Sequence, residues 1–107
     1  MEMRSVPPAG SAAYQEFLRS TDISVGVYRL QRGAPDVQQP HSEDEVYYVL
    51  AGRAKFTAAD TTVEVQPGVC LFVPAREPHR FHDVVETLEV LVVFGPAEGS
   101  RTPGSRA

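Results

Sequence analysis

Short apolar segments separated by Gly and Pro are the feature that most constrains the fold of this chain. From Ile23 onward, apolar residues alternate with small or polar ones, which is the period-two pattern of a β-strand with one buried face. Six further segments have strand character, namely residues 45–50, 54–57, 62–65, 69–73, 79–82 and 88–94. Short strands with almost no helical pattern predict an all-β sandwich or barrel of antiparallel strands.

A small double-sheet jelly roll is an economical solution for 107 residues, which have room for one core. The alternation alone does not separate it from an immunoglobulin-like sandwich. We predict a barrel domain over residues 23–94 and an N-terminal arm over residues 1–22, in which residues 14–18 could form one helical turn. Residues 95–107 are rich in Gly, Pro, Ser and Ala, and we expect a flexible tail there.

Composition excludes several classes of protein. The formal net charge is −4, whereas a nucleic-acid-binding domain would need a basic face. No segment approaches the ~18 apolar residues of a membrane span, and the N-terminus has no apolar secretory core. The one cysteine, Cys70, cannot form an intramolecular disulfide, so the expected compartment is the reducing cytoplasm.

The first of two polar clusters precedes the strand expected at residues 45–50. In an extended chain, residues two apart share a face, so His41 and Glu45 can point inward together, with Tyr47 continuing that face. An imidazole nitrogen and a carboxylate oxygen would then meet, as ligands of a first-row metal do. The alternative interpretation is a solvated acidic loop over residues 43–45.

The second cluster follows the turn at Pro74. Alternation places His79, Phe81 and Asp83 on one face of a strand, with Arg80 and His82 on the other. His79 alone would more often be a hydrogen-bonded structural histidine than a ligand. Its partnership with the first cluster favours a metal site.

Both clusters resemble the two signature motifs of the cupin superfamily. The first family motif is Gly, five residues, His, one, His, three or four, Glu, six, Gly, and its positions fall here on Gly33, Gln39, His41, Glu45 and Gly52. The second is Gly, five residues, Pro, one, Gly, two, His, three, Asn, and its positions fall on Gly68, Pro74, Arg76, His79 and Asp83. Fifteen residues separate the motifs, which is usual for small bacterial-type cupins.

The resemblance implies a cupin-type double-stranded β-helix, or jelly-roll barrel, that binds one divalent transition metal. The ligand roles carry over to His41, Glu45 and His79, and the fourth family position falls on Gln39. Gln39 is either a weak fourth ligand or a neighbour of a two-histidine, one-carboxylate triad, the arrangement of non-haem iron oxygenases. Glu43 could substitute for Glu45, although the spacing to Gly52 favours Glu45. Fe(II) is the favoured metal, with Zn, Mn or Ni as alternatives.

The resemblance favours a metal-dependent oxygenase or dioxygenase of small-molecule metabolism. The alternatives are redox-neutral chemistry at zinc or another divalent metal, such as an isomerase or lyase reaction, and a non-catalytic module that binds a small ligand. Tyr47 is the candidate catalytic residue, as a phenol that orients substrate or donates a proton; a position in the barrel wall is the alternative.

The remaining residues have simpler expected roles. Phe72, Phe81 and Phe94 are expected in the core, and Cys70 is expected to be a buried, inert thiol. His82 is expected outside the barrel or at a dimer contact. Arg76 and Arg80 are expected at the surface or at the dimer edge; if they face the barrel mouth, they favour an acidic substrate.

We also expect a homodimer, because small cupins usually pair. Residues 1–13 could add a strand to the open sheet edge of a partner. One of two apolar stripes could supply the contact, either Leu88, Val90, Val92 and Phe94 or, on the opposite face, Leu91 and Val93.

Overall fold

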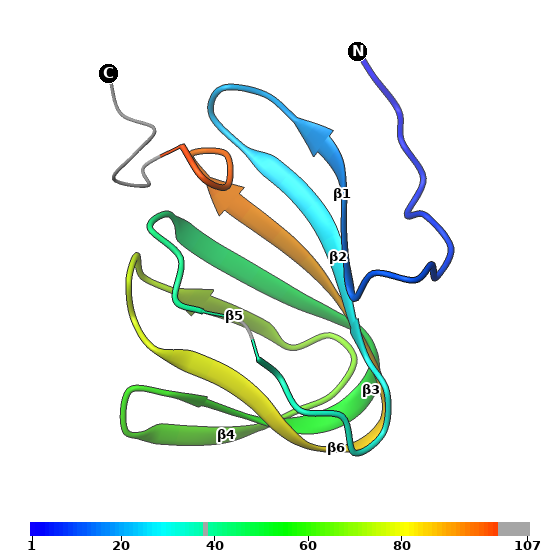
Figure 1. Ribbon diagram of the computed structural model, residues 1–107, viewed down its shortest axis with the longest axis vertical. Coiled ribbons are helices and arrows are strands. Elements are labelled where there is room, and N and C mark those ends of the chain that lie inside the picture. Colours follow the sequence, from blue (N-terminus) through cyan, green and yellow to red (C-terminus); the bar gives the residue numbers. More distant parts are fainter. Residues whose placement is uncertain (38, 101–107) are drawn as a thin grey trace.

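The computed structural model describes residues 1–37 and 39–100, which form six strands and no helix. The strands are β1 (Tyr14–Arg19), β2 (Ser24–Leu30), β3 (Asp44–Ala58), β4 (Thr61–Val65), β5 (Cys70–Val73) and β6 (His79–Gly95). All pairings are antiparallel, in the order β1-β2-β6-β3-β4, and β5 also pairs with β3 (Figure 1). The prediction of one small all-β domain is therefore confirmed.

Strands β3 and β6 pair along the whole of β3, and both bend (Figure 1). Each joins two segments that were predicted as separate strands. Register shifts between Val49 and Lys55 mark β-bulges, which bend a strand and increase its twist. Gly52 lies within this stretch at φ +93°, and a Cβ atom there would lie 2.3 Å from the backbone oxygen of Thr87. Only glycine allows that approach.

Because β3 bends, its two halves pair with different strands. Its first residues pair with β5, and its last five pair with β4. Side chains from both parts meet in one core, and fully burying a Phe or Leu there stabilises the fold by about 1.5–3 kcal/mol. Large side chains in this core include Tyr28, Tyr47, Phe56, Phe81, Leu88 and Phe94.

The N-terminal segment differs from its prediction. Residues 14–18 do not form a helical turn but belong to β1, which pairs with β2 from Tyr14↔Tyr28 to Arg19↔Ser24. As a strand, these residues form backbone hydrogen bonds with the edge of the sheet. One isolated helical turn is unstable in water and would form fewer such bonds. The preceding arm contacts its own chain, because Arg4 donates to the Phe17 carbonyl and Arg29 to the Pro7 carbonyl.

Three positions on β5 and β6 were also placed wrongly. Asp83 has φ +50° and is exposed, because a bulge there breaks the alternation and turns Val84 inward instead. Cys70 is exposed, and Phe72 is 62% exposed, since both belong to the outer face of β5. Phe81 and Phe94 are buried as expected. Within the described residues, no helix is long and apolar enough to cross a membrane.

The described part of the C-terminal segment is packed against the barrel, in contrast to the predicted tail. Ala97 is 1% exposed, and the Glu98 amide donates to Ser24 Oγ. The Glu98 carbonyl accepts a hydrogen bond of 2.6 Å from Arg19, and the Gly99 amide donates to Glu43 Oε1. Residues 96–99 therefore form a strap at one end of the barrel; residues 101–107 lie outside the described residues.

The outer face of the sheet carries a row of apolar side chains. Phe72 pairs with Val46, and Val46 pairs with Val93. The alternative stripe is buried inside the barrel, so it cannot contact a partner subunit. It consists of Leu88, Val90, Val92 and Phe94. We propose that a homodimer would form through the outer row.

Replacing Phe72 with Glu should convert a dimer into a monomer, because it places a charge in an apolar contact. Light scattering at micromolar concentration measures the mass. Val85→Glu, at an exposed apolar residue outside this row, is the matched control and should stay dimeric. A monomeric unmodified protein would contradict the dimer.

Candidate metal centre

Three side chains from two parts of the chain meet inside the barrel. His41 lies in the loop before β3, Glu45 is the second residue of β3, and His79 is the first residue of β6. Glu45 is 2% exposed and His79 is also buried. Alternation along β3 points Glu45 and Tyr47 inward, as the sequence pattern predicted.

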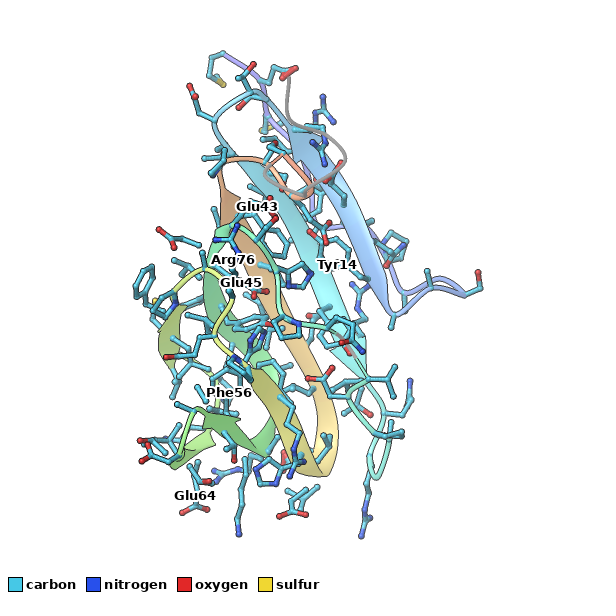
Figure 2. All side chains as sticks on the ribbon, turned by 60° about the vertical axis from the view of Figure 1, so that its left-hand side comes forward. Tyr14, Glu43, Glu45, Phe56, Glu64 and Arg76 are labelled. Carbon is cyan, nitrogen blue, oxygen red and sulfur yellow. The ribbon has the colours of Figure 1, made fainter. Side chains whose placement is uncertain are left out.

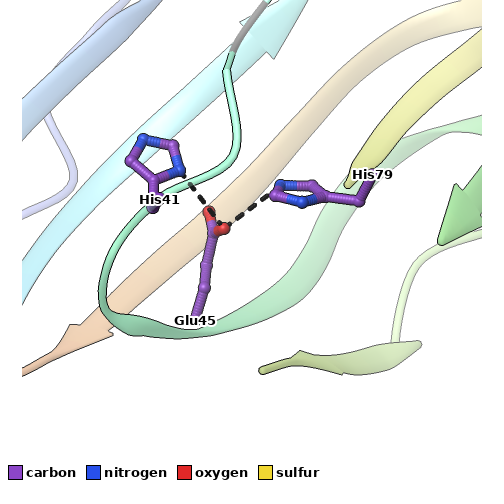
Figure 3. A group of neighbouring side chains, drawn as sticks. All are labelled: His41, Glu45 and His79. Carbon is purple, nitrogen blue, oxygen red and sulfur yellow. Dashed lines mark ion pairs between the residues drawn. The ribbon is translucent and has the colours of Figure 1, made fainter. Parts of the chain in front are cut away.

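The geometry of this triad is compact (Figure 3). Glu45 Oε1 lies 3.6 Å from His41 Nδ1 and 3.2 Å from His79 Nε2. One ligand atom from each of the three residues lies within 4.8 Å of the others. Two imidazoles and a carboxylate in this arrangement could hold a divalent metal and leave coordination positions open.

Each histidine has an outer partner that fixes which nitrogen faces the triad. His79 Nδ1 donates to the Glu77 carbonyl at 2.9 Å, which leaves the Nε2 lone pair directed at Glu45. His41 Nε2 lies 3.1 Å from Glu98 Oε2, which leaves Nδ1 for the site. Metal-binding histidines commonly have such partners, which orient the ring and select the tautomer.

Two ligand atoms of the triad make no hydrogen bond. His41 Nδ1 and Glu45 Oε1 are both buried without a hydrogen-bond partner. A buried polar atom left in this state costs about 1–3 kcal/mol, so a native protein normally satisfies it. Adjacent unsatisfied nitrogen and oxygen lone pairs fit a bound cation, and the residues present therefore suit the metal that the sequence predicts.

Without a metal, protons compensate the buried charge. The nearby carboxylates of Glu45 and Glu98 raise the pKa of His41 to about 9, although burial opposes the shift. Burial alone would raise the pKa of Glu45, but the neighbouring side chains of His41, His79 and Tyr47 outweigh it and lower that pKa. Burial would lower the pKa of His79, and the bond to Glu45 reverses the direction.

Tyr47 takes part in both the site and the barrel wall. Its hydroxyl lies 3.1 Å from His79 Nε2, and its ring makes edge contacts with Phe56 and Phe81. The side chain is fully buried, so the wall fixes where the phenol points. A position in the barrel wall is therefore compatible with the predicted catalytic role of the Tyr47 phenol.

An inner cavity of about 100 Å³ adjoins the triad. Its lining includes three phenols, two triad residues and one further carboxylate: Tyr14, Tyr28, His41, Glu45, Tyr47, Val92, Phe94 and Glu98. An outer cleft of about 450 Å³ shares His41 and Glu98 with it and also includes Arg76. In the view of Figure 2, Glu43, Arg76 and Glu45 are labelled in the same part of the molecule, and Arg76 and Glu43 both line the outer cleft. The His41–Glu98 pair therefore lies between an inner cavity and an outer cleft.

The family model described as Cupin domain matches residues 26–94. The chain belongs to the cupin family. An uncharacterized protein of Streptomyces coelicolor is 45% identical to this cupin over 97 residues, 91% of this chain and 92% of the relative.

Solved structures have the same fold. The TT1209 protein of Thermus thermophilus superposes with a TM-score of 0.73 at 23% identity, over 91% of this chain and 99% of that one. The DMSP lyase DddQ of Ruegeria pomeroyi superposes with a TM-score of 0.67 at 25% identity, over 71% of this chain. This cupin spans only 39% of the length of DddQ.

The triad of His41, Glu45 and His79 does not include Glu43 or His82. Gln39 is exposed and lines neither the inner cavity nor the outer cleft; its role as a fourth ligand stays a prediction. Glu43 is buried, but its carboxylate accepts hydrogen bonds from Ser42 Oγ and the Gly99 amide. It holds the strap, and Glu45 is the triad carboxylate. His82 Nε2 lies 2.7 Å from Thr57 Oγ1 and does not reach the site.

Three residues that line the inner cavity were not predicted as site residues: Tyr14, Tyr28 and Glu98. Tyr14 and Glu98 come from the terminal segments that were predicted as an arm and a tail. The aromatic and apolar residues around Tyr14 were a usable signal for a strand. Glu98 had no such signal, because its contact with His41 depends on how residues 96–99 dock.

Metal-free protein should lose stability as the pH rises from 6.5 to 9. The folded-state pKa of His41, about 9, exceeds its ordinary value of 6.5, so its ion pairs stabilise the fold fully below pH 6.5 and are lost through pH 9. Urea midpoints measure the trend. Zinc-loaded protein should gain stability over the same range, because metal binding requires deprotonated histidines.

His41→Gln is the control for this trend and should flatten the metal-free profile. Equal midpoints at pH 6.5 and 9 in the metal-free protein would contradict the assigned ion pairs. So would a decline of the same size in His41→Gln.

Proposed function

We propose that this cupin is a metal-dependent enzyme that catalyses a redox-neutral reaction, of the lyase or isomerase type, on a small molecule with a carbonyl or carboxylate group. The observation that carries the proposal is the triad with two unsatisfied buried ligand atoms, opening on a cavity lined by phenols. His41 Nδ1, Glu45 Oε1 and His79 Nε2 would hold the metal. A divalent ion bound there would act as a Lewis acid that polarises a substrate oxygen.

Tyr47 is the best-placed group for proton transfer. Its hydroxyl bonds to His79 Nε2, the same atom that faces Glu45. Tyr47 also lowers the pKa of Glu45 through a side-chain hydrogen bond, so its hydroxyl lies against two residues of the triad, and it lines the inner cavity. A phenol held there by packing against Phe56 and Phe81 can donate a proton to, or accept one from, a reacting group.

The surroundings of the site support a small, oxygen-bearing substrate. The inner cavity has room for only a few heavy atoms, so the rest of a larger substrate would lie in the outer cleft. Arg76 is exposed and lines that cleft, where its guanidinium favours an acidic group. The 25% identity to a DMSP lyase supports redox-neutral chemistry, although the two chains differ greatly in length.

The oxygenase hypothesis remains the second candidate, supported by the donor set itself. Two histidines and one carboxylate with open positions are the ligands of non-haem Fe(II) oxygenases. The two candidates differ in their need for oxygen and for a redox-active metal. Binding without turnover would leave only the binding-module hypothesis.

Zinc-loaded and anaerobic iron-loaded protein should both convert a common substrate from a panel of small carboxylates and carbonyl compounds. Tyr47→Phe should keep its metal and lose about 10²- to 10⁴-fold in kcat, the usual contribution of an acid–base group. Product formation and metal content are measured on the same samples. Tyr48→Phe, on the exposed outer face of β3, is the matched control and should behave like the unmodified protein.

Turnover that requires both iron and oxygen would contradict redox-neutral chemistry and favour the oxygenase. Nitric oxide bound to the iron protein, with a spin signal that the substrate perturbs, would agree with that outcome. Unchanged kcat in Tyr47→Phe would remove Tyr47 from the reaction.

A further inference from the structure

Tyr14 brings a phenol from the edge strand β1 into the inner cavity. Its hydroxyl is buried and makes no hydrogen bond. Figure 2 shows Tyr14 and Glu45 at similar heights in the barrel, and both residues line the same cavity. A buried hydroxyl normally has a hydrogen-bond partner, so the Tyr14 hydroxyl can still donate a hydrogen bond within the cavity.

Gly26 makes the space for this phenol. A Cβ atom at residue 26 would lie 2.3 Å from both Cζ and Oη of Tyr14. The end of the side chain therefore rests directly over the backbone of β2. The Tyr14 ring also makes an edge-to-face contact with Phe94, at 6.3 Å between ring centroids.

The other two phenols of the cavity are already engaged. The Tyr28 hydroxyl donates to Asp36 Oδ1 at 2.6 Å, and the Tyr47 hydroxyl bonds to His79 Nε2. Tyr14 alone among the three has an unsatisfied hydroxyl. Burial and the nearby carboxylates of Glu98 and Glu16 raise the pKa of Tyr14, so the group keeps its proton at neutral pH and stays a donor.

We propose that the Tyr14 hydroxyl donates a hydrogen bond to a carbonyl or carboxylate oxygen of a ligand in the inner cavity. The donor would fix the ligand beside the triad, and this role rests on the function proposed above. Tyr14 is then a residue that determines which small molecules the site accepts, because a ligand without an acceptor oxygen leaves the hydroxyl unpaired.

The cavity limits how much of the ligand reaches Tyr14. A protein cavity of about 150 Å³ takes one benzene, with six heavy atoms. By proportion, the 100 Å³ beside the triad takes about four heavy atoms. Acetate and acetamide each have four and differ in charge, so they serve as matched probes for a carboxylate and a neutral carbonyl.

The test is a titration of zinc-loaded protein with acetate and with acetamide, followed by NMR. Tyr14→Phe should weaken acetate binding about tenfold or more and acetamide binding about threefold, since hydrogen bonds to a charged acceptor are stronger. Gly26→Ala should weaken both probes as well, because it displaces the phenol without deleting it. Tyr48→Phe is the control and should match the unmodified protein.

A 3-fluorotyrosine label gives a second readout. The chain has four tyrosines, so four fluorine signals are expected, and the signal lost in Tyr14→Phe should shift when the favoured probe binds the unmodified protein. Equal affinities of unmodified protein and Tyr14→Phe for both probes would overturn the inference, as would no binding of either probe. Tyr14-dependent binding without any turnover would instead overturn the proposed function alone.

Discussion

The pairing of β3 with β6 along a bent ribbon is the constraint on which the rest of the structure depends. Glu45 pairs with Phe94 at one end of β3, and His79 pairs with Ala58 at the other. A straight strand from residue 45 to residue 58 would span about 40 Å. Yet Glu45 Oε1 and His79 Nε2 lie 3.2 Å apart, because the ribbon curls until its ends meet. The bulges around Gly52 make that curl, and the site exists as a result of it.

A triad inside a barrel is hard to justify by stability. Burying a carboxylate and two imidazoles costs desolvation energy that apolar side chains of similar size would avoid. Glu45 is nevertheless held between two histidines, and two of the ligand atoms make no hydrogen bond. Local rules are broken most often where a protein acts, so this exception to a well-packed core supports the proposal that the triad is the functional site.

Much of the fold was predictable because alternation and turn residues report on local structure. The strand segments from residue 23 onward were predicted, whereas β1 was not. The resemblance to the two cupin motifs pointed to His41, Glu45 and His79, whose side chains lie together in the structure. The prediction failed where a bulge interrupts the alternation of side chains along a strand. At Asp83 the bulge turns the side chain outward, whereas simple alternation predicted that it would point inward. Apolar character also misled, since Cys70 and Phe72 lie on an outer sheet face that looks like a core strand in sequence.

The two ends of the chain were the hardest part to predict. Tyr14 and Glu98 reach the site only after β1 has paired with β2 and residues 96–99 have docked on Ser24 and Glu43. Such contacts depend on distant partners and leave no periodic pattern. The terminal segments, read as an arm and a tail, therefore complete the cavity that the central motifs only begin.

The most direct test of the metal centre is anomalous diffraction from crystals of the protein loaded with zinc, collected at the zinc absorption edge. The account predicts one strong peak, about 2.0–2.2 Å from His41 Nδ1, His79 Nε2 and a Glu45 carboxylate oxygen, the usual zinc–ligand distances. A loaded crystal with no anomalous peak among these three side chains, or with zinc only on surface residues, would contradict it.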